Sequence, residues 1–249
     1  YVIKFSSAKK LREFLKSKPV IRDLIVLEKV KRYKDADGNT KTKVKKRLIL
    51  NLKSSGVSGA SKKHERVLLP RTLDAVFEIM EAKRANPECG DIELVVLDFA
   101  DAFFQFPVNG DELKYMVTTA GGAFYVFNRA AQGSRGAPLL CGRSLALVMR
   151  LASSLASGSS ARQALYVDGP IFILAGDRPR RNRSMANIVG AILALNFKLA
   201  FEKAQTATTG ETLTWTSASY TITEDGVTVK VKEDIVTEVE ARIAAMRCT

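Results

Sequence analysis

Two acidic residues, Asp98 and Asp168, have the residue type and the sequence setting to do chemistry. Each follows an apolar run typical of a strand, IELVVL before Asp98 and ALYV before Asp168. Carboxylates brought together where strands end can bind a pair of divalent metal ions, and such a pair stabilises the attacking and leaving oxygens of a phosphoryl transfer. The residues alone leave a simpler interpretation open, because an aspartate at a strand end is often a helix cap or a turn residue, and Asp-Gly is itself a hairpin signal.

The segments around these aspartates predict an α+β fold, an antiparallel sheet with helices packed on one face. The run ELVVLDF indicates a strand that is buried on both faces. In the predicted helix 72–83, the apolar residues Leu73, Val76, Phe77 and Met80 are expected to form the buried side. The expected hairpins pair 23–34 with 40–53, 114–120 with 123–129, 164–169 with 170–175, and 213–222 with 227–231; the other expected helices span 8–18, 137–156, 184–199 and 233–246.

Positive charge is concentrated near the start of the chain. The net charge is +13, and residues 1–68 carry 20 Lys and Arg against 6 Asp and Glu. A nucleic-acid backbone or a nucleoside triphosphate suits such a surface, although a solvated basic face or an anionic-membrane patch fits the charge run as well. Lysines alternate along both arms of the first hairpin, so several ammonium groups should share one face and repel unless an anion binds there: Lys29, Lys31, Lys41, Lys43 and Lys45.

Several classes of function are disfavoured by the residues that the sequence lacks. His64 is the only histidine, and the three cysteines are far apart, which argues against a zinc site and a disulfide framework. There is no phosphate-binding G-x-x-x-x-G-K-S/T sequence and no nucleophile elbow. No apolar stretch approaches the ~18 residues of a membrane span, and the sequence, which starts at Tyr1, shows no charged leader followed by an apolar region and a cleavage site. We therefore expect an intracellular protein without a membrane partner; its compartment, nuclear or cytoplasmic, and its oligomeric state are left open.

Five sequence motifs in a fixed order resemble a known family. LDFADAFFQFPV, FYVFNRAAQGSRGAP, YVDG, FEKAQ and LTWTSASYTITEDGVTV are similar to the successive motifs of retroelement reverse transcriptases of the long-terminal-repeat type, and KKRLILNLKSSG resembles their fingers segment. The resemblance covers roughly residues 20 to 245. It implies a basic fingers-like subdomain at 1–90, a polymerase palm at 91–222 with a fingers-like insertion around 112–132, and the start of a thumb or connection at 223–249.

The resemblance implies roles for the catalytic residues. Asp98 and Asp168 would hold two Mg²⁺ ions, with Mn²⁺ as a possible substitute, and Lys203 would donate a proton to the departing pyrophosphate. Without the resemblance, a lysine such as Lys203 at a helix end is more commonly a partner of the helix dipole. Tyr166 and Trp215 would contact the primer and template, whereas the residues alone favour packing aromatics.

The resemblance also implies a nucleotide-binding set. Arg47 would contact the triphosphate, with Lys43 or Lys45 as a second candidate, because a guanidinium can bind two phosphate oxygens at once. Asp101 would lie near the triphosphate, and Phe103 would exclude a ribose 2′-hydroxyl by its bulk, although a core phenylalanine is the simpler interpretation. The contacts to nucleotide and template would come from Gln132 and Gly133, where glycine lets a backbone approach the substrate.

One departure from the family pattern is the reason for keeping two hypotheses. The family usually has two adjacent aspartates where this chain reads Tyr166-Val167-Asp168-Gly169, so one metal-binding carboxylate is missing. The first hypothesis is an RNA-directed DNA polymerase that uses an RNA or DNA template with a primer and deoxynucleoside triphosphates, impaired by Gly169. The alternative is a catalytically decayed retroelement copy that acts only as a nucleic-acid-binding module. The least specific possibility is an unrelated basic RNA-binding α/β protein.

Overall fold

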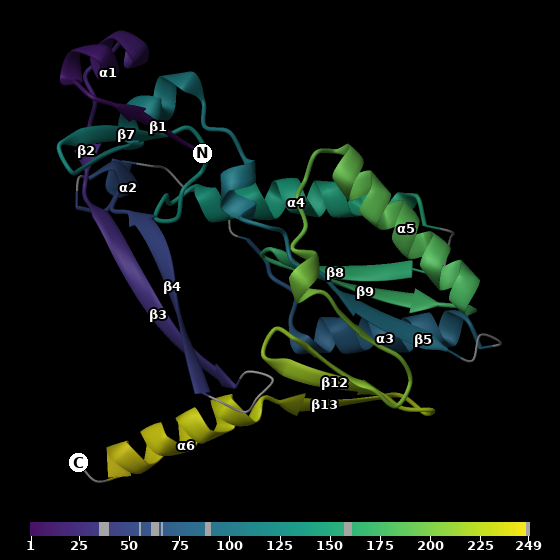
Figure 1. The fold of residues 1–249 in the computed structure, drawn as a ribbon. Helices are drawn as coiled ribbons and strands as arrows, with labels where there is room; N and C mark the ends of the chain where they lie inside the picture. Colours follow the sequence, from purple (N-terminus) through teal and green to yellow (C-terminus); the bar gives the residue numbers. More distant parts are fainter. Residues whose placement is uncertain are drawn as a thin grey trace. The chain divides into compact units, whose positions relative to one another are not determined.

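The computed structural model describes residues 1–34, 40–54, 56–60, 65, 67–87, 91–156 and 161–247. The expected turn of the first hairpin, together with His64, Cys89 and Cys248, lies outside the described residues. The chain divides into two compact units: residues 1–66 with 101–141, and residues 67–100 with 142–249. Figure 1 labels the elements of both units. In the described part of the chain, no helix is long and apolar enough to cross a membrane.

The first unit is built on a four-stranded sheet in the order β1-β7-β6-β2. Gly121 and Gly122 form the turn between β6 and β7 with φ angles of 55° and 74°, a conformation that glycine adopts without steric cost. Helix α1 packs Leu11 against Val117 and Val126 to form the core over this sheet. Apart from the ribbon described next, the elements of the first unit are β1 (Val2–Phe5), α1 (Ala8–Leu15), β2 (Ile21–Arg22), α2 (Val57–Ala60), the short 3₁₀ helices η1 (Ala102–Gln105) and η2 (Gly110–Tyr115), β6 (Val117–Ala120) and β7 (Ala123–Phe127).

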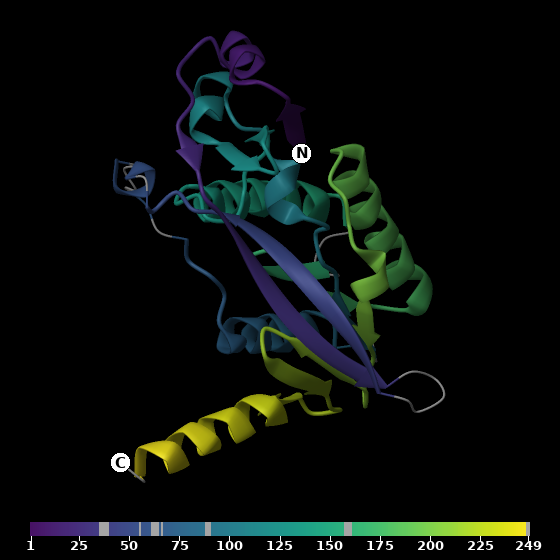
Figure 2. The same cartoon turned by 60° about the vertical axis from the view of Figure 1, so that its left-hand side comes forward.

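A long two-stranded ribbon also belongs to the first unit. Strands β3 (Leu24–Lys34) and β4 (Thr40–Leu50) pair antiparallel over their whole length, from Leu24 opposite Leu50 to Lys34 opposite Thr40. Figure 2 shows the twist of this ribbon. The hairpin expected between 23–34 and 40–53 is thus present. At the base of the ribbon, Leu50 and Leu52 pack with Met116 and Phe127 in a second small core.

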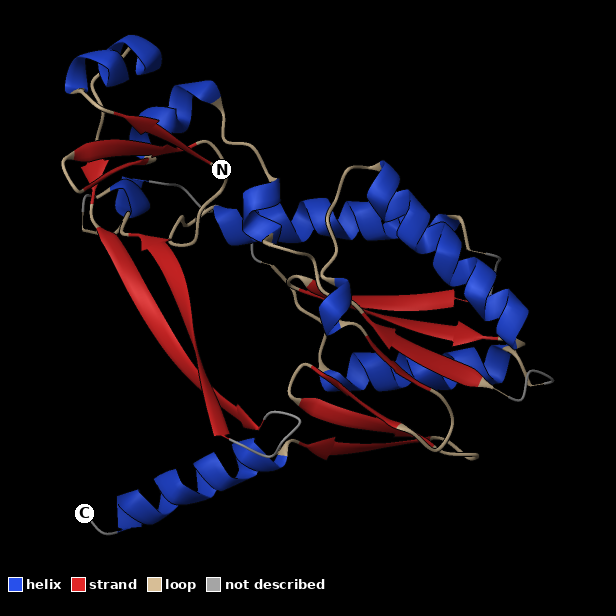
Figure 3. Cartoon of the chain, viewed as in Figure 1, coloured by secondary structure: helices blue, strands red, loops and turns tan. Residues whose placement is uncertain are grey.

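The second unit contains the sheet that carries both predicted catalytic aspartates. This sheet has the order β10-β5-β9-β8, and a second sheet, β11-β12-β13, packs its buried residues into the same core. Figure 3 shows both sheets and their helices. The elements are α3 (Thr72–Ala85), β5 (Ile92–Val96), β8 (Ala161–Tyr166), β9 (Gly169–Ala175), α5 (Arg178–Ala194), η4 (Phe201–Lys203), β10 (Gln205–Ala207), β11 (Thr212–Trp215), β12 (Ala218–Ile222), β13 (Val227–Val231) and α6 (Glu233–Arg247), with α4 (Ala137–Ser154) beginning in the first unit and continuing into the second.

Helices lie against both faces of this sheet, which corrects the expectation of helices on one face only (Figure 3). On one face, Ile79 of α3 belongs to the same buried cluster as Leu94 of β5. On the other face, Arg181 of α5 donates to Glu93, the residue next to Leu94, at 3.1 Å. Strand neighbours point to opposite faces, so α3 and α5 cover opposite sides. The second face is also apolar, because Val95 and Phe172 lie on it and are buried. Apolar side chains on both faces of a sheet are stabilised when helices exclude water from both.

The buried side of α3 also differs from the expectation. Of the four expected residues, Val76 is partly buried and packs against the core, but Leu73 and Phe77 are 69% and 61% exposed, and Met80 is exposed as well. The buried residues are instead spaced four and then three apart along the helix, namely Ala75, Ile79 and Ala82. This helix has two apolar stripes, and the stripe with two alanines is the one that packs on β8 and β9, where small side chains permit close approach.

Two further elements differ from the sequence-based boundaries. The segment 213–222, expected to be one strand, is two strands joined by Thr216 and Ser217, whose φ angles are 47° and 69°. Neither residue is the Gly or Asn that usually marks such a turn. The helix expected at 184–199 runs from Arg178 to Ala194, because the Asp177 side chain accepts from the Arg180 N–H at 2.9 Å and caps its first turn.

Candidate active site

The two predicted catalytic aspartates lie at the same end of two neighbouring strands. Strands β5 and β9 pair antiparallel, with Val96 opposite Ile171, so the end of β5 lies beside the start of β9. Asp98 comes just after β5, and Asp168 comes just before β9. The pairing continues past the named strands, because the Phe99 N–H donates to the Asp168 carbonyl at 2.9 Å. Antiparallel pairing therefore brings together two aspartates that are distant in the sequence.

Lys203 completes this cluster from a third segment. Its Nζ donates to Oδ2 of Asp98, and its backbone is held nearby because the Ala200 N–H donates to the Asp98 carbonyl at 2.8 Å. The hydrogen bond to Asp98 raises the pKa of Lys203, which outweighs the lowering by partial burial, and the charges of Glu202 and Asp168 raise it further. The lysine is therefore charged at neutral pH and within electrostatic reach of both aspartates.

The turn that carries Asp168 has a strained backbone. Tyr166 pairs with Gly169, which leaves Val167 and Asp168 as the two central residues of the hairpin. Val167 has a φ of 57°, in the left-handed region that β-branched residues avoid. A positive φ at the first central position is a feature of type II′ turns, where glycine is usual. For a non-glycine residue this conformation costs about 1–2 kcal/mol, so the neighbouring residues must hold it in place.

Trp215 is the residue that braces this turn. Its indole N–H donates to the Gly169 carbonyl at 2.9 Å, and its ring meets the Tyr166 ring edge-on, with centroids 6.4 Å apart. Trp215 is only 4% exposed, whereas Tyr166 is partly open to solvent at 40%. The structure thus brings both sequence-predicted aromatics next to the aspartate turn, with Trp215 buried and Tyr166 partly exposed.

Two carboxylates are a set of donors that suits a magnesium ion. Mg²⁺ commonly uses one or two protein carboxylates and completes its shell with water and phosphate oxygens. Within the described residues, no group of three or more His, Cys, Asp or Glu side chains gathers to hold an ion by itself. A third carboxylate could be accommodated at position 169, because a Cβ added to Gly169 would find its nearest neighbours, the Tyr166 and Leu97 carbonyl oxygens, at 3.7 and 3.9 Å.

The backbone register of the β3–β4 ribbon agrees with the alternation of lysines expected from the sequence. The register places Lys29 opposite Lys45 and Lys31 opposite Lys43. Arg47 is opposite Leu27, two residues along from Lys45, and is therefore on the same face of the ribbon. The side chains of Lys31, Lys43 and Lys45 lie outside the described residues. The register therefore places several Lys and Arg positions on the same face of the ribbon.

Gln132 and Gly133 lie against the base of the same ribbon. The Leu50 N–H donates to the Gln132 carbonyl at 2.9 Å. Gly133 has a φ of 103°, and a Cβ there would lie 2.1 Å from the Leu50 carbonyl oxygen. Glycine is required at this position because of a close approach between two backbone segments. Asp101, with a φ of 48°, and the half-buried Phe103 lie at the start of η1 in the same unit.

Solved structures with a similar fold are available for comparison. No protein-family model and no curated protein matches the sequence. A foamy viral protease-reverse transcriptase in complex with double-stranded DNA matches with a TM-score of 0.58 at 14% identity, over 87% of this chain and 33% of that chain. The foamy viral enzyme in complex with an RNA/DNA hybrid also matches with a TM-score of 0.58 at 14% identity, over 90% of this chain and 25% of that one. A further double-stranded DNA complex matches with a TM-score of 0.57 at 13% identity, over 87% of this chain and 40% of that chain.

The fold of this chain is similar to part of the foamy viral protease-reverse transcriptase. It spans between a quarter and two fifths of the length of these reverse transcriptase chains. The fold is a mixed α/β arrangement with several sheets, as the sequence motifs indicated. Sequence identity of 13–14% supports this likeness of fold alone.

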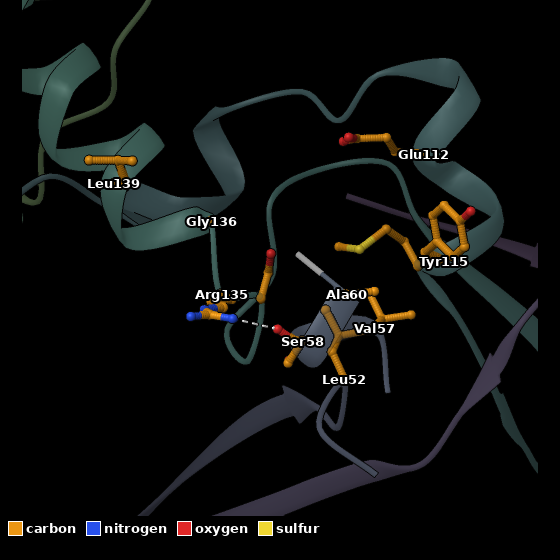
Figure 4. A pocket seen from close by; sticks show the side chains of 11 residues that line it. Leu52, Val57, Ser58, Ala60, Glu112, Tyr115, Arg135, Gly136 and Leu139 are labelled. Carbon is orange, nitrogen blue, oxygen red and sulfur yellow. Dashed lines mark hydrogen bonds between the residues drawn. The ribbon is translucent and has the colours of Figure 1, made fainter. Parts of the chain in front are cut away.

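One cavity among the described residues belongs wholly to the first unit. It has a volume of about 520 Å³ and lies in the first unit, between α2, η2 and the start of α4 (Figure 4). Arg135 donates to the Ser58 carbonyl at 3.0 Å across its wall. None of the predicted site residues lines it. This cavity is therefore not the candidate active site, which lies at the ends of β5 and β9 in the second unit.

Sequence reasoning did not identify two contacts of this site. The hydrogen bond from Trp215 to Gly169 and the ion pair of Lys203 with Asp98 both join segments that are distant along the chain. The motif order indicated that these residues belong to one site, but it gave no information about which atoms meet. Only the pairing of the strands determines those contacts.

Proposed function

We propose that this chain is the polymerase region of a reverse transcriptase, which adds deoxynucleotides to a primer 3′ end on an RNA or DNA template. The observation that carries the proposal is the placement of Asp98 and Asp168 at the same end of β5 and β9, in a chain with a reverse-transcriptase-like fold. The neighbours of known structure are complexes with DNA or with an RNA/DNA hybrid, which supports a nucleic-acid partner for this chain. In this proposal the first unit supplies the fingers, the second unit supplies the palm, and α6 begins a thumb or connection.

The residues of the chain would divide the work of the reaction. Asp98 and Asp168 would hold two Mg²⁺ ions, or Mn²⁺ in their place, and when bound these ions would stabilise the negative charge on the reacting oxygens. Lys203 holds a proton on Nζ beside Asp98 and would donate it to the departing pyrophosphate. Trp215 and Tyr166 would keep the Asp168 turn in position under the primer end.

A second group of residues would bind the incoming nucleotide. Arg47 and the lysine-rich face of the ribbon would neutralise the triphosphate, with Lys43 and Lys45 as neighbours. Asp101 would lie near the triphosphate, and Phe103 would exclude a 2′-hydroxyl. Gln132 and Gly133, attached to the base of the ribbon at Leu50, would contact the nucleotide and template.

Gly169 favours a second candidate function. With two carboxylates in place of the family's three, the site can bind metal weakly enough that the chain serves only as a nucleic-acid-binding module, a decayed copy that keeps the basic ribbon. Such a module would bind template with an affinity that falls steeply with salt, because phosphate contacts release counterions. Salt-dependent binding without synthesis is its expected behaviour.

Primer extension on an RNA template, with Mg²⁺ and then with Mn²⁺, tests the two functions. A polymerase extends the primer, and Asp98→Asn abolishes the extension while Asp225→Asn, in an exposed turn of the same unit, leaves it unchanged. If the parent is inactive and Gly169→Asp creates activity, the binding-module function is correct for the natural sequence. Failure of both the parent and Gly169→Asp to extend, with folding intact by circular dichroism, would contradict the polymerase proposal.

A further inference from the structure

Lys203 occupies the carboxylate that a catalytic metal would need. Its Nζ binds Oδ2 of Asp98, one of the two acidic side chains that the proposed function assigns to metal binding. We propose that Lys203 and a divalent ion compete for Asp98, so that metal loading displaces the lysine from the carboxylate. This inference rests on the proposed function only in taking Asp98 as a metal ligand.

Backbone hydrogen bonds hold Lys203 near Asp98, so the contact between the two side chains does not depend on the length of the lysine alone. The segment before Lys203 is bonded to the segment around Asp98 at two points: the Ala100 N–H donates to the Lys198 carbonyl at 2.9 Å, and the Ala200 N–H donates to the Asp98 carbonyl at 2.8 Å. The Lys203 N–H then donates to the Ala200 carbonyl at 3.0 Å and closes the turn of η4. These bonds set the Cα of Lys203 beside Asp98 whichever direction its side chain takes.

The charges of the site make the competition effective. Gly169 contributes no carboxylate. The Lys203 ammonium group contacts Asp98, and the charges of Asp168 and the neighbouring Glu202 also act on it. A divalent ion at Asp98 needs the same oxygen lone pairs, and like charges at contact distance repel strongly. The Lys203 side chain is half exposed, which leaves room for it to turn away when an ion binds. Displacement then frees the ammonium group that the proposed function directs to pyrophosphate.

Mn²⁺ binding to the whole chain, without nucleotide or primer, measures this competition. Trp215 is the only tryptophan, and its indole N–H is bonded to Gly169, the residue after Asp168. Paramagnetic Mn²⁺ at the aspartates should quench its fluorescence, and the titration gives an apparent Kd. Lys203→Met should tighten Mn²⁺ binding by about 3- to 10-fold, the range expected for removing one partly exposed competing charge.

Three variants control the measurement. Lys203→Arg keeps the charge and should leave the Kd within about twofold of the parent. Lys230→Met removes one exposed positive charge from β13 in the same unit and should also leave it unchanged. Asp98→Asn in the Lys203→Met background should return Mn²⁺ binding to the parent level or weaker, which assigns the tightened site to Asp98.

The outcomes are distinct from those of primer extension. Tighter binding by Lys203→Met alone supports the competition even if no variant extends a primer. An unchanged or weaker Kd for Lys203→Met, with its far-ultraviolet circular dichroism equal to that of the parent, overturns it. A gain in Lys230→Met as large as that in Lys203→Met also overturns it, because the effect would then belong to net charge. Saturation in neither the parent nor Lys203→Met up to 20 mM Mn²⁺ contradicts it as well.

Discussion

Replacing Trp215 by Phe should destabilise the second unit, because Trp215 braces the strained turn that carries Asp168. The substitution removes the donor that reaches the Gly169 carbonyl at 2.9 Å, and loss of a buried partner of this kind costs about 1–3 kcal/mol. The phenyl ring also fills less of a site that is only 4% exposed, and the cavity adds about 1 kcal/mol. We expect a total loss of about 2–4 kcal/mol in the free energy of unfolding.

Tyr220→Phe is the matched control for this prediction. Tyr220 is fully buried and its ring packs on Trp215 with centroids 6.3 Å apart. Among the described residues, its hydroxyl has no hydrogen-bond partner. Removing that hydroxyl should leave the stability unchanged or raise it by up to about 1 kcal/mol, since a buried polar group without a partner is unfavourable.

Urea unfolding followed by far-ultraviolet circular dichroism compares the parent with both variants, and fluorescence of Trp215 in the parent identifies the transition of the second unit. The reasoning is refuted if Trp215→Phe lies within about 0.5 kcal/mol of the parent, or if Tyr220→Phe loses as much stability as Trp215→Phe.

Three further predictions follow from the packing and the charges. Gly133→Ala should destabilise the first unit by roughly 2–4 kcal/mol, because the added Cβ would lie 2.1 Å from the Leu50 carbonyl oxygen. Gly136→Ala is the control and should leave the stability unchanged, because no atom lies within 4 Å of the Cβ it would add. Equal thermal midpoints for the two variants would contradict the clash at Gly133. Arg181→Met should cost about 3–5 kcal/mol in urea unfolding because it leaves Glu93 without its buried cation, and a neutral effect would show that the pair is dispensable. The pKa of the Asp74 carboxyl is lowered because it accepts a hydrogen bond from the Arg71 N–H at 2.7 Å, so this cap stabilises α3 above pH 3.8 and its contribution is lost as the pH falls through the lowered pKa. Asp74→Asn should remove this part of the acid unfolding transition measured by circular dichroism. Identical acid transitions for the parent and Asp74→Asn would contradict this role of the cap.

The sequence predicted the elements of the site well, because local signals mark them. The apolar run before Asp98 indicated a strand buried on both faces, and Asp-Gly at 168 and 169 indicated a hairpin. The strand and the hairpin are present, but the turn is centred on Val167 and Asp168, and Gly169 already belongs to the second strand. The sequence also indicated that the lysines of the ribbon alternate, and the register places Lys29 opposite Lys45. The spacing of apolar residues and the residue types of turns are determined within a few residues of the chain, so the sequence alone is enough to predict them.

The features that sequence patterns did not reveal depend on contacts between distant segments. The apolar stripe of α3 with Leu73 and Phe77 had the stronger signal, yet the strands pack on the alanine stripe. Thr216 and Ser217 form a turn without glycine, so the strand boundary there carried no mark. The clearest case is the close approach of Gly133 to the Leu50 carbonyl oxygen, which joins two segments that no local pattern connects.

The joint action of Asp98 and Asp168 is tested most directly by the primer-extension rates of Asp98→Asn, Asp168→Asn and the double variant in Mn²⁺. Two carboxylates that hold the same metal ions act as a unit, so either single substitution should reduce the rate as far as both together. Asp168→Asn with the rate of the parent, or single effects that multiply independently in the double variant, would contradict a shared site.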